Sequence, residues 1–227
     1  MHRARPAAVL GESGRRRRIR LPTMARPAKF TDEQVLDAAL AVVARVGRAA
    51  TMAEIAAEVG CQVGSLYYRF PSREVLLIRL WIRSVRRFQA EFLAAAARPD
   101  PADAVAAAAR TIPEYCAAHP DEARALTLFR HQALMEAGPP PEVAEDLTGL
   151  NDHAGQVLGE LVARRFGRVA PDLIALVDTV IREVPYGLVR RHIGAAEPMP
   201  PWLPDLIGAS VSTMLAVGDT WTDDEDE

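Results

Sequence analysis

The segment from Thr51 to Leu77 constrains the fold of this 227-residue chain more than any other part of the sequence. A T-x-x-E capping box begins at Thr51, and Gly60 is a natural helix stop. A short aromatic segment, 62–69, follows, and after a proline Ser72 is placed to cap a long helix. Two short helices joined by a tight turn form a helix-turn-helix, the motif whose second helix enters the DNA major groove. The segment therefore predicts a DNA-reading head.

Helical periodicity continues through the rest of the chain. No stretch alternates apolar and polar residues as a half-buried strand does, so we predict an all-α fold of about nine helices. Three helices form the head and the others form a larger body. Pro113 and Pro185 fall inside helical patterns and are expected to kink or shorten them. The expected helices span residues 31–46, 51–59, 62–69, 72–97, 102–118, 121–136, 142–166, 171–194 and 204–218.

Charge divides the chain further, because the net charge of −3 hides two opposite ends. We predict a basic extension at 1–25, the helix-turn-helix domain at 26–72, a ligand-binding and dimerisation domain at 73–219, and an acidic tail at 220–227. The arginine-rich extension has two interpretations: an arm that touches DNA phosphates or a minor groove, or a poorly ordered segment upstream of a true start at Met24. The sequence does not decide between starts at Met1 and Met24.

Several classes of protein lack support in the sequence. No apolar run approaches the ~20 residues of a membrane span, and the two cysteines form neither a disulfide framework nor a zinc pattern. The histidines are scattered, and no phosphate-binding, dinucleotide-binding or nucleophile motif is present. We therefore expect no metal, no cofactor, no membrane partner and no catalytic residues, in a cytoplasmic protein that is not an enzyme.

The head offers two sets of DNA-binding candidates. Bases are read from the N-terminal part of a recognition helix, which here carries Gln62, Val63, Gly64 and Ser65. Phosphates are held by cations, hydroxyls and helix N-termini, which here are supplied by Thr51, Tyr67, Tyr68, Arg69 and Arg73. Leu66 and Phe70 are assigned to the core instead. Tyr67 is also compatible with a core position, and a head of this shape is compatible with a protein-binding module.

These residues resemble the signature of the TetR/AcrR family of transcriptional regulators, over about 50 residues from Phe30 to Leu80. Four positions depart from the family pattern: Cys61 replaces a small apolar residue in the turn, Gln62 a common Ser, Arg69 a common His and Arg73 a common Lys. The resemblance implies a transcriptional repressor that binds a palindromic operator in double-stranded DNA as a homodimer and is released by a small ligand. The matching residues are Gly60, Gly64, Ser65, Leu66, Tyr67, Phe70, Ser72, Leu76 and Leu77.

The last two helices carry broad apolar stripes, which are typical either of an intramolecular core or of a dimer interface. In the family that this chain resembles, the two terminal helices of each subunit build a four-helix interface, and this favours the dimer. The expected interface residues are Val177, Val180, Val184, Leu188, Val211, Met214 and Leu215.

A pocket for a small apolar or aromatic effector is expected in the body, because aromatic side chains line such pockets, although they fill cores more often. The candidates are Trp81, Phe88, Phe129, His131, Asn151, His153 and Tyr186. A ligand-independent regulator with a packed body and a transcriptional activator remain alternatives. The sequence identifies neither the effector nor the operator.

Overall fold

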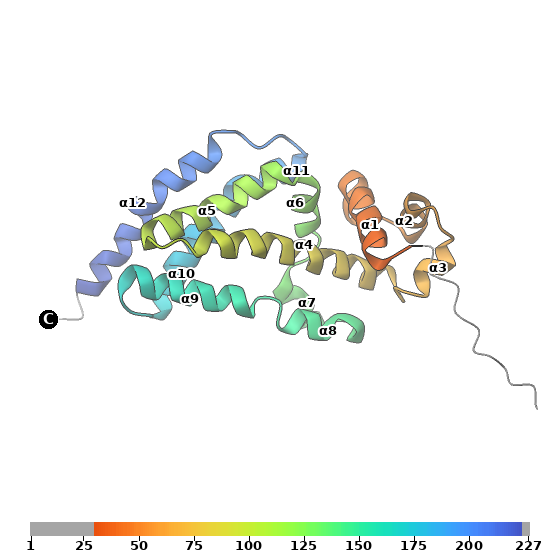
Figure 1. Ribbon diagram of the computed structural model, residues 1–227, viewed down its shortest axis with the longest axis horizontal. Helices are drawn as coiled ribbons and strands as arrows, with labels where there is room; N and C mark the ends of the chain where they lie inside the picture. The colour runs from red at the N-terminus through yellow and green to blue at the C-terminus, as the bar shows by residue number, and fades with distance from the viewer. Residues whose placement is uncertain (1–29, 224–227) are drawn as a thin grey trace, which may run out of the picture.

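A computed structural model describes residues 30–223, and over this range the chain is helical without strands (Figure 1). The predicted basic extension, 1–25, and residues 224–227 of the acidic tail lie outside the described residues. The head consists of α1 (Asp32–Val46), the short turn η1 (Gly47–Ala49), α2 (Met52–Val59) and α3 (Val63–Tyr67). The body consists of α4 (Arg73–Ala96), α5 (Pro101–Ala118), α6 (Pro120–Leu126), α7 (His131–Ala137), α8 (Pro141–Thr148), α9 (Asp152–Phe166), α10 (Pro171–Asp178), η2 (Thr179–Glu183), α11 (Val184–Ala195) and α12 (Leu203–Asp223).

Local capping signals set the helix boundaries of the head. Thr31 forms a capping box, in which its backbone N–H donates to Gln34 Oε1 at 2.8 Å, and Thr51 forms an equivalent box at the start of α2. Gly60 ends α2 in the left-handed conformation, with φ of 75°. Ser72 Oγ accepts a hydrogen bond from the N–H of Val75 at 3.1 Å and so caps α4. The helix starts and the helix stop predicted at these positions are confirmed.

All nine expected helical segments occur within the described residues, but three of them are subdivided. The predicted helix 121–136 breaks between α6 and α7, where Trp81 Nε1 donates to the carbonyl of Leu126 at 3.1 Å and Leu128 turns into the core. The predicted helix 142–166 breaks at residues 149–151, between α8 and α9. The expectation of unbroken helices is wrong at both places, because contacts with α4 and core packing compete with continued helix.

Neither internal proline interrupts the run of helical residues, but a π-helical turn before Pro185 subdivides the predicted helix 171–194. Pro113 lies inside the uninterrupted α5. Pro185 follows the π-helical turn η2, in which the N–H of Val184 bonds to the carbonyl of Thr179, five residues back. A π turn widens the spiral. This relieves the contact between a proline ring and the carbonyl four residues earlier, the contact that otherwise breaks a helix.

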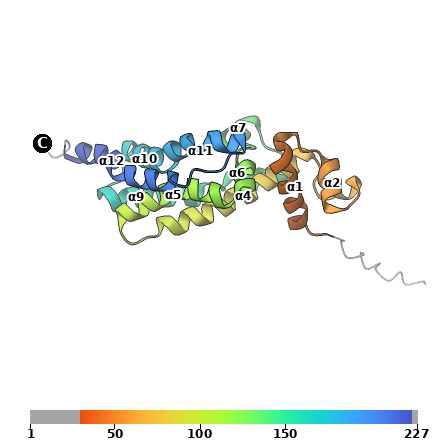
Figure 2. The same cartoon turned by 90° about the horizontal axis from the view of Figure 1, so that it is seen from above.

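Two hydrophobic cores stabilise the chain. The first joins the head to the beginning of α4, and it also takes in Leu128, Leu134, Val143 and Leu147 from the segment containing α7 and α8. The second lies among α5, α9, α10, α11 and α12, with the far end of α4. In Figures 1 and 2, α4 runs from the head along the body, and α6 lies against α1. None of the described helices combines the length and apolarity needed to cross a membrane.

Candidate nucleic-acid interface

The recognition helix α3 is anchored by its buried side and leaves its predicted reading edge exposed. Leu66 and Phe70 are fully buried, which confirms their assignment to the core. Gln62 is the N-cap residue of α3 but makes no capping bond with its side chain, so its amide is not committed to the helix start. Val63, Gly64 and Ser65 are exposed beside it. The four predicted base-reading residues therefore lie together on one accessible edge.

Gly64 lies in this edge without any internal packing reason to be a glycine. A Cβ built at Gly64 would meet no atom within 4 Å, and its φ is not in the left-handed region. A helical glycine costs stability relative to alanine, since it loses more backbone freedom on folding. A side chain at Gly64 would therefore remove this stability cost without meeting any other part of the protein. The open space around Gly64 lies on the side predicted to face DNA.

Two tyrosines extend the exposed edge at the end of α3. Tyr67 is 49% exposed and Tyr68 is 93% exposed, so the alternative of a core position for Tyr67 is not observed. A tyrosine hydroxyl donates hydrogen bonds to phosphate oxygens in many DNA complexes. The pair is therefore accessible for the predicted phosphate contacts.

Thr51 is already engaged within its own capping box. Its hydroxyl accepts from the N–H of Glu54 at 3.2 Å and donates to Glu54 Oε2 at 2.7 Å. These bonds hold the pKa of the Glu54 carboxyl below its usual value of 4.5. A phosphate that approached Thr51 would meet the Glu54 carboxylate as well. The Thr51 hydroxyl acts first as a helix cap, and its contact with DNA stays a prediction.

The two predicted arginines also have intramolecular partners. Arg69 forms an ion pair with Asp32 at the start of α1. Arg73 donates from Nε and Nη2 to the backbone carbonyls of Ala50 and Arg48, and it thereby ties the start of α4 to the loop before α2. Both guanidinium groups serve as internal ties, so phosphate binding by either one has to compete with these contacts.

Sequence reasoning missed the arginines Arg45 and Arg48, whose partners are distant in the sequence. Arg45 pairs with Glu58 of α2 at 2.7 Å. The Arg48 guanidinium lies 5.1 Å from the centre of the Phe129 ring in the body. Every arginine of residues 30–73 thus has a partner inside the protein, and the exposed edge of α3 itself carries no cation.

Further ties fix the head on the body. Arg124 of α6 donates to the carbonyl of Ala44 near the end of α1 at 2.5 Å, where a cation also complements the helix dipole. Arg83 of α4 pairs with Glu33 at 3.0 Å and with Asp37 at 2.8 Å. A rotation of α1 relative to α4 or α6 would break these contacts, so the position of the head depends on the body.

The predicted ligand-binding residues do not form one site. Trp81 is buried and stands edge-on to Phe129, with ring centres 6.3 Å apart. Phe88 instead stands edge-on to Tyr115, at 5.4 Å. His131 Nε2 lies 2.7 Å from the carbonyl of Leu147, which holds α7 against α8. These contacts bind helices of the body together.

The remaining candidates lie apart from those rings. Asn151 Oδ1 accepts from Gln89 Nε2 at 3.1 Å, while His153 and Tyr186 are exposed. The sequence pattern gave no indication of these separate environments, because it places residues on helix faces without showing which faces meet.

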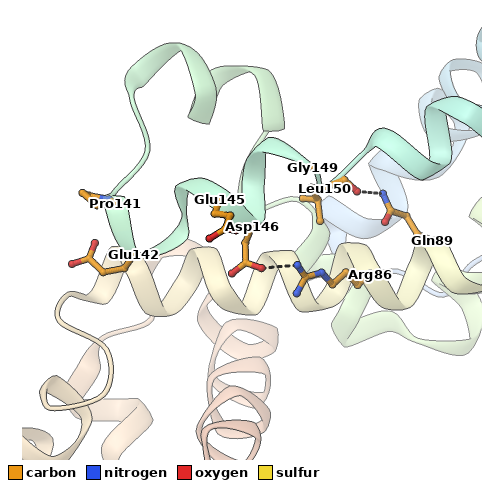
Figure 3. Close-up of a pocket in the computed structure, with 8 residues that line it drawn as sticks. All are labelled: Arg86, Gln89, Pro141, Glu142, Glu145, Asp146, Gly149 and Leu150. Carbon is orange, nitrogen blue, oxygen red and sulfur yellow. Dashed lines mark hydrogen bonds and ion pairs between the residues drawn. The ribbon is translucent and has the colours of Figure 1, made fainter.

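Two hollows flank α4 on the side of α8 and α9. The first is an open cleft of about 400 Å³ with a polar and charged lining, in which Arg86 pairs with Asp146 at 2.6 Å (Figure 3). The second measures about 90 Å³ and lies between α4 and α9. None of the seven predicted ligand-binding residues lines either hollow. The cleft is lined by Arg86, Gln89, Pro141, Glu142, Glu145, Asp146, Gly149 and Leu150.

Most of the predicted dimer residues face the interior of their own chain. Val184 and Met214 are half-buried, and Leu188 is exposed. The predicted apolar stripe is therefore not an outer surface. Its central residues are buried in the second hydrophobic core of the same chain. The four members that are fully within that core are Val177, Val180, Val211 and Leu215.

The fold and the exposed edge of α3 define the class of this protein: an all-helical, helix-turn-helix DNA-binding protein. Residues 35–80 match the family model described as "Bacterial regulatory proteins, tetR family". No curated protein sequence matches the chain. Within the described residues, no group of three or more His, Cys, Asp or Glu side chains could hold a metal ion.

Solved structures share the fold. A transcriptional regulator from Rhodococcus sp. Rha1 is 20% identical, with 82% of this chain and 97% of that chain covered and a TM-score of 0.63. A TetR family regulator from Marinobacter aquaeolei VT8 is 18% identical, with coverage of 81% and 94% and a TM-score of 0.59. FadR from Bacillus subtilis, solved in complex with stearoyl-CoA, is 15% identical, with coverage of 81% and 97% and a TM-score of 0.55. Residues 35–80 thus match the tetR family of bacterial regulatory proteins, and the described chain shares the fold of these solved transcriptional regulators.

Proposed function

We propose that the protein is a homodimeric repressor that binds a palindromic operator and is released by a small apolar or aromatic effector. The observation that carries this proposal is the short exposed edge of α3 on a head that is tied to α4 and α6. One such edge contacts few bases, and a two-fold dimer doubles the site by reading two half-sites. The protein would act in the cytoplasm, on bacterial DNA.

The outer face of α12 supports the dimer. It exposes a row of apolar and small side chains at helical spacing, with Leu206 52% and Val217 50% exposed. Small residues allow two helices to approach closely, and burial of this face in a dimer would remove apolar surface from water. We place the interface on this row, in place of the buried residues of the predicted stripe. The row consists of Leu206, Ala209, Thr213, Ala216 and Val217.

A charge at Leu206 tests this interface. Leu206→Glu should give a monomer in analytical ultracentrifugation and should weaken operator binding, because the two heads would no longer be linked. Met135→Glu, at an exposed apolar side chain of α7, is the matched control and should leave the dimer intact. A Leu206→Glu protein that sediments as a dimer would place the interface elsewhere.

An effector would enter between α4 and the α8–α9 side, where both hollows lie. Leu93, Val157 and Leu161 supply apolar lining there. Separation of α9 from α4 would shift α4, and the head is attached to the beginning of α4. Because binding free energies are reciprocal, an effector that lowers operator affinity 5- to 150-fold, or about 1–3 kcal/mol, must bind the DNA complex more weakly by the same factor.

Stearoyl-CoA is the first probe, because it is bound in the FadR structure with the same fold, and an anilinonaphthalene dye is the aromatic probe. Either probe should reduce operator binding. The Leu93→Trp variant fills the smaller hollow, so it should still bind the operator but should no longer respond to the probes. The larger hollow is open and polar, unlike an enclosed pocket for an apolar ligand. This favours a second candidate function, a ligand-independent regulator with a packed body. Operator binding that neither probe changes supports that candidate. Increased transcription of the controlled gene after deletion of the regulator distinguishes a repressor from an activator.

A further inference from the structure

The exposed edge of α3 lacks the charged side chains that read G·C base pairs. Arginine and lysine bind the two major-groove acceptors of guanine, and aspartate and glutamate accept from the amino group of cytosine. The edge from Gln62 to Ser65 contains none of these residue types. The exposed Tyr67 and Tyr68 that follow it are uncharged as well. Recognition of bases by this edge therefore depends on neutral side chains.

The arginines that follow α3 are engaged inside the protein. Arg69 pairs with Asp32, and its guanidinium lies 5.4 Å from the centre of the Phe30 ring. Arg73 donates to two backbone carbonyls in the segment before α2. Either guanidinium would have to give up these contacts before it could reach a guanine. Guanine recognition by an arginine thus carries a cost that recognition by an uncommitted side chain does not.

Gln62 presents an amide that suits adenine. It is the exposed N-cap residue of α3, and its side chain makes no capping hydrogen bond. A glutamine amide carries one acceptor oxygen and one donor nitrogen group. It can accept from the N6 amino group of adenine and donate to N7 at the same time. Guanine offers two acceptors at these positions, so the amide oxygen of Gln62 would face no donor there.

Val63 places an apolar side chain beside this amide. It is 36% exposed, although valine is a residue that a folded chain usually buries. The C5-methyl group of thymine is the apolar group on the major-groove edges of the bases, and burial of a methyl group against Val63 would remove apolar surface from water. A Cβ at the following Gly64 would meet no atom within 4 Å, so Gly64 leaves space for the groove to approach. The hydroxyl of Ser65 can contact either kind of base pair and adds no preference.

We propose that the edge of α3 reads A·T base pairs, with Gln62 bound to an adenine and Val63 packed on a thymine methyl group in each half-site. The inference rests on the proposed function and names the sequence class of the operator. The bases that α3 contacts should include at least one A·T pair, because the adenine N6 and N7 atoms and the thymine methyl group lie on the same major-groove edge of such a pair.

Removal of the thymine methyl group tests the role of Val63. The probe is a duplex that the full chain selects from a random pool, in which the thymine of a protected A·T pair is replaced by deoxyuridine in one half-site. The natural chain should bind this duplex about 4-fold more weakly, the loss expected for one buried methyl group. Val63→Ala should bind the thymine and deoxyuridine duplexes equally. Val169→Ala, at a valine of the body that is 56% exposed, is the matched control and should discriminate as the natural chain does.

Removal of the adenine N7 acceptor tests the role of Gln62. Replacement of the adenine by 7-deazaadenine in the same half-site keeps the base pair but deletes one of the two hydrogen bonds to the amide. The natural chain should bind this duplex roughly 5-fold more weakly, at the lower end of the range for a bidentate contact because the bond to N6 remains. Gln62→Ala should bind the adenine and 7-deazaadenine duplexes equally. Gln132→Ala, at an exposed glutamine of α7, is the matched control and should retain the 5-fold difference.

The possible results separate this readout from the proposed function. Selected half-sites whose protected bases are all G·C would overturn the A·T readout and leave the regulator intact. Equal binding of the natural chain to the natural and both modified duplexes would do the same. A pool from which the full chain enriches no sequence would overturn both the readout and the proposed function. The modified duplexes probe the natural chain itself, so these outcomes do not depend on the folding of any variant.

Discussion

Replacement of Gly64 by alanine should raise the folding stability and lower the affinity for DNA. The structure supplies the reason for the first effect, since a Cβ at Gly64 meets no protein atom within 4 Å. Alanine in a helix is more favourable than glycine by about 0.5–1 kcal/mol. In a chain of this length, that gain corresponds to a melting temperature higher by roughly 1–4 °C.

The effect on DNA binding should have the opposite sign, because the added methyl group projects from the edge between Val63 and Ser65 that is predicted to face the bases. Loss of a well-placed base contact costs about 1–3 kcal/mol. A dimer carries two recognition helices, so the cost counts twice, and the affinity should fall roughly 30-fold or more.

Scanning calorimetry measures the first effect, and fluorescence anisotropy with a selected duplex measures the second. Gly155→Ala is the matched control, because Gly155 is an exposed glycine of α9 that also has open space around its Cβ position. It should raise stability by a similar amount and leave DNA affinity unchanged. If Gly64→Ala binds the duplex as tightly as the natural chain, Gly64 does not face DNA and the assignment of α3 as the reading helix is wrong.

Three further predictions concern individual contacts. The Thr51–Glu54 capping box depresses the pKa of Glu54 below 4.5. The stabilisation from this box should therefore be present above pH 4.5 and lost as the pH falls through the folded-state pKa of Glu54. Glu54→Gln should flatten this part of the pH dependence of urea unfolding. Burial raises the pKa of the Cys116 thiol to about 12, so a thiol reagent at about pH 8 should label Cys116 only in denaturant, and labelling in the native protein would contradict its burial. Arg124→Met keeps the side-chain stem but removes the hydrogen bond to the Ala44 carbonyl. The folding free energy should fall by about 1 kcal/mol, and hydrogen exchange at the end of α1 should become faster. Unchanged exchange at the end of α1 would disprove this contact between head and body.

The parts of the fold that depend on neighbouring residues could be predicted from the sequence. The caps at Thr31, Thr51 and Ser72 and the stop at Gly60 are all local signals, and each one appears in the structure. The break at 149–151 also had a local signal in Gly149, which the helical pattern around it obscured. The break after Leu126 had none, since it depends on a hydrogen bond from Trp81, 45 residues earlier.

The functional surfaces were harder to predict because charge and burial are decided between helices. Arg69 and Arg73 fit a phosphate-binding pattern, and the sequence could not show that Asp32 and two backbone carbonyls occupy them. Periodicity likewise shows that Val177 and Val180 share a face with each other, but not whether that face meets the same chain or a second copy. Both residues prove to be core, which shifts the proposed interface to the row on α12 that contains Leu206.

The most direct test of the central claim is a hydroxyl-radical footprint of the full chain on its selected duplex. Two recognition helices in a two-fold dimer should protect two inverted half-sites whose centres lie about one helical turn, or a whole number of turns, apart. A single protected half-site would contradict the dimer. The absence of any sequence-specific protection would contradict the assignment of the edge from Gln62 to Ser65 as the part of the molecule that reads DNA.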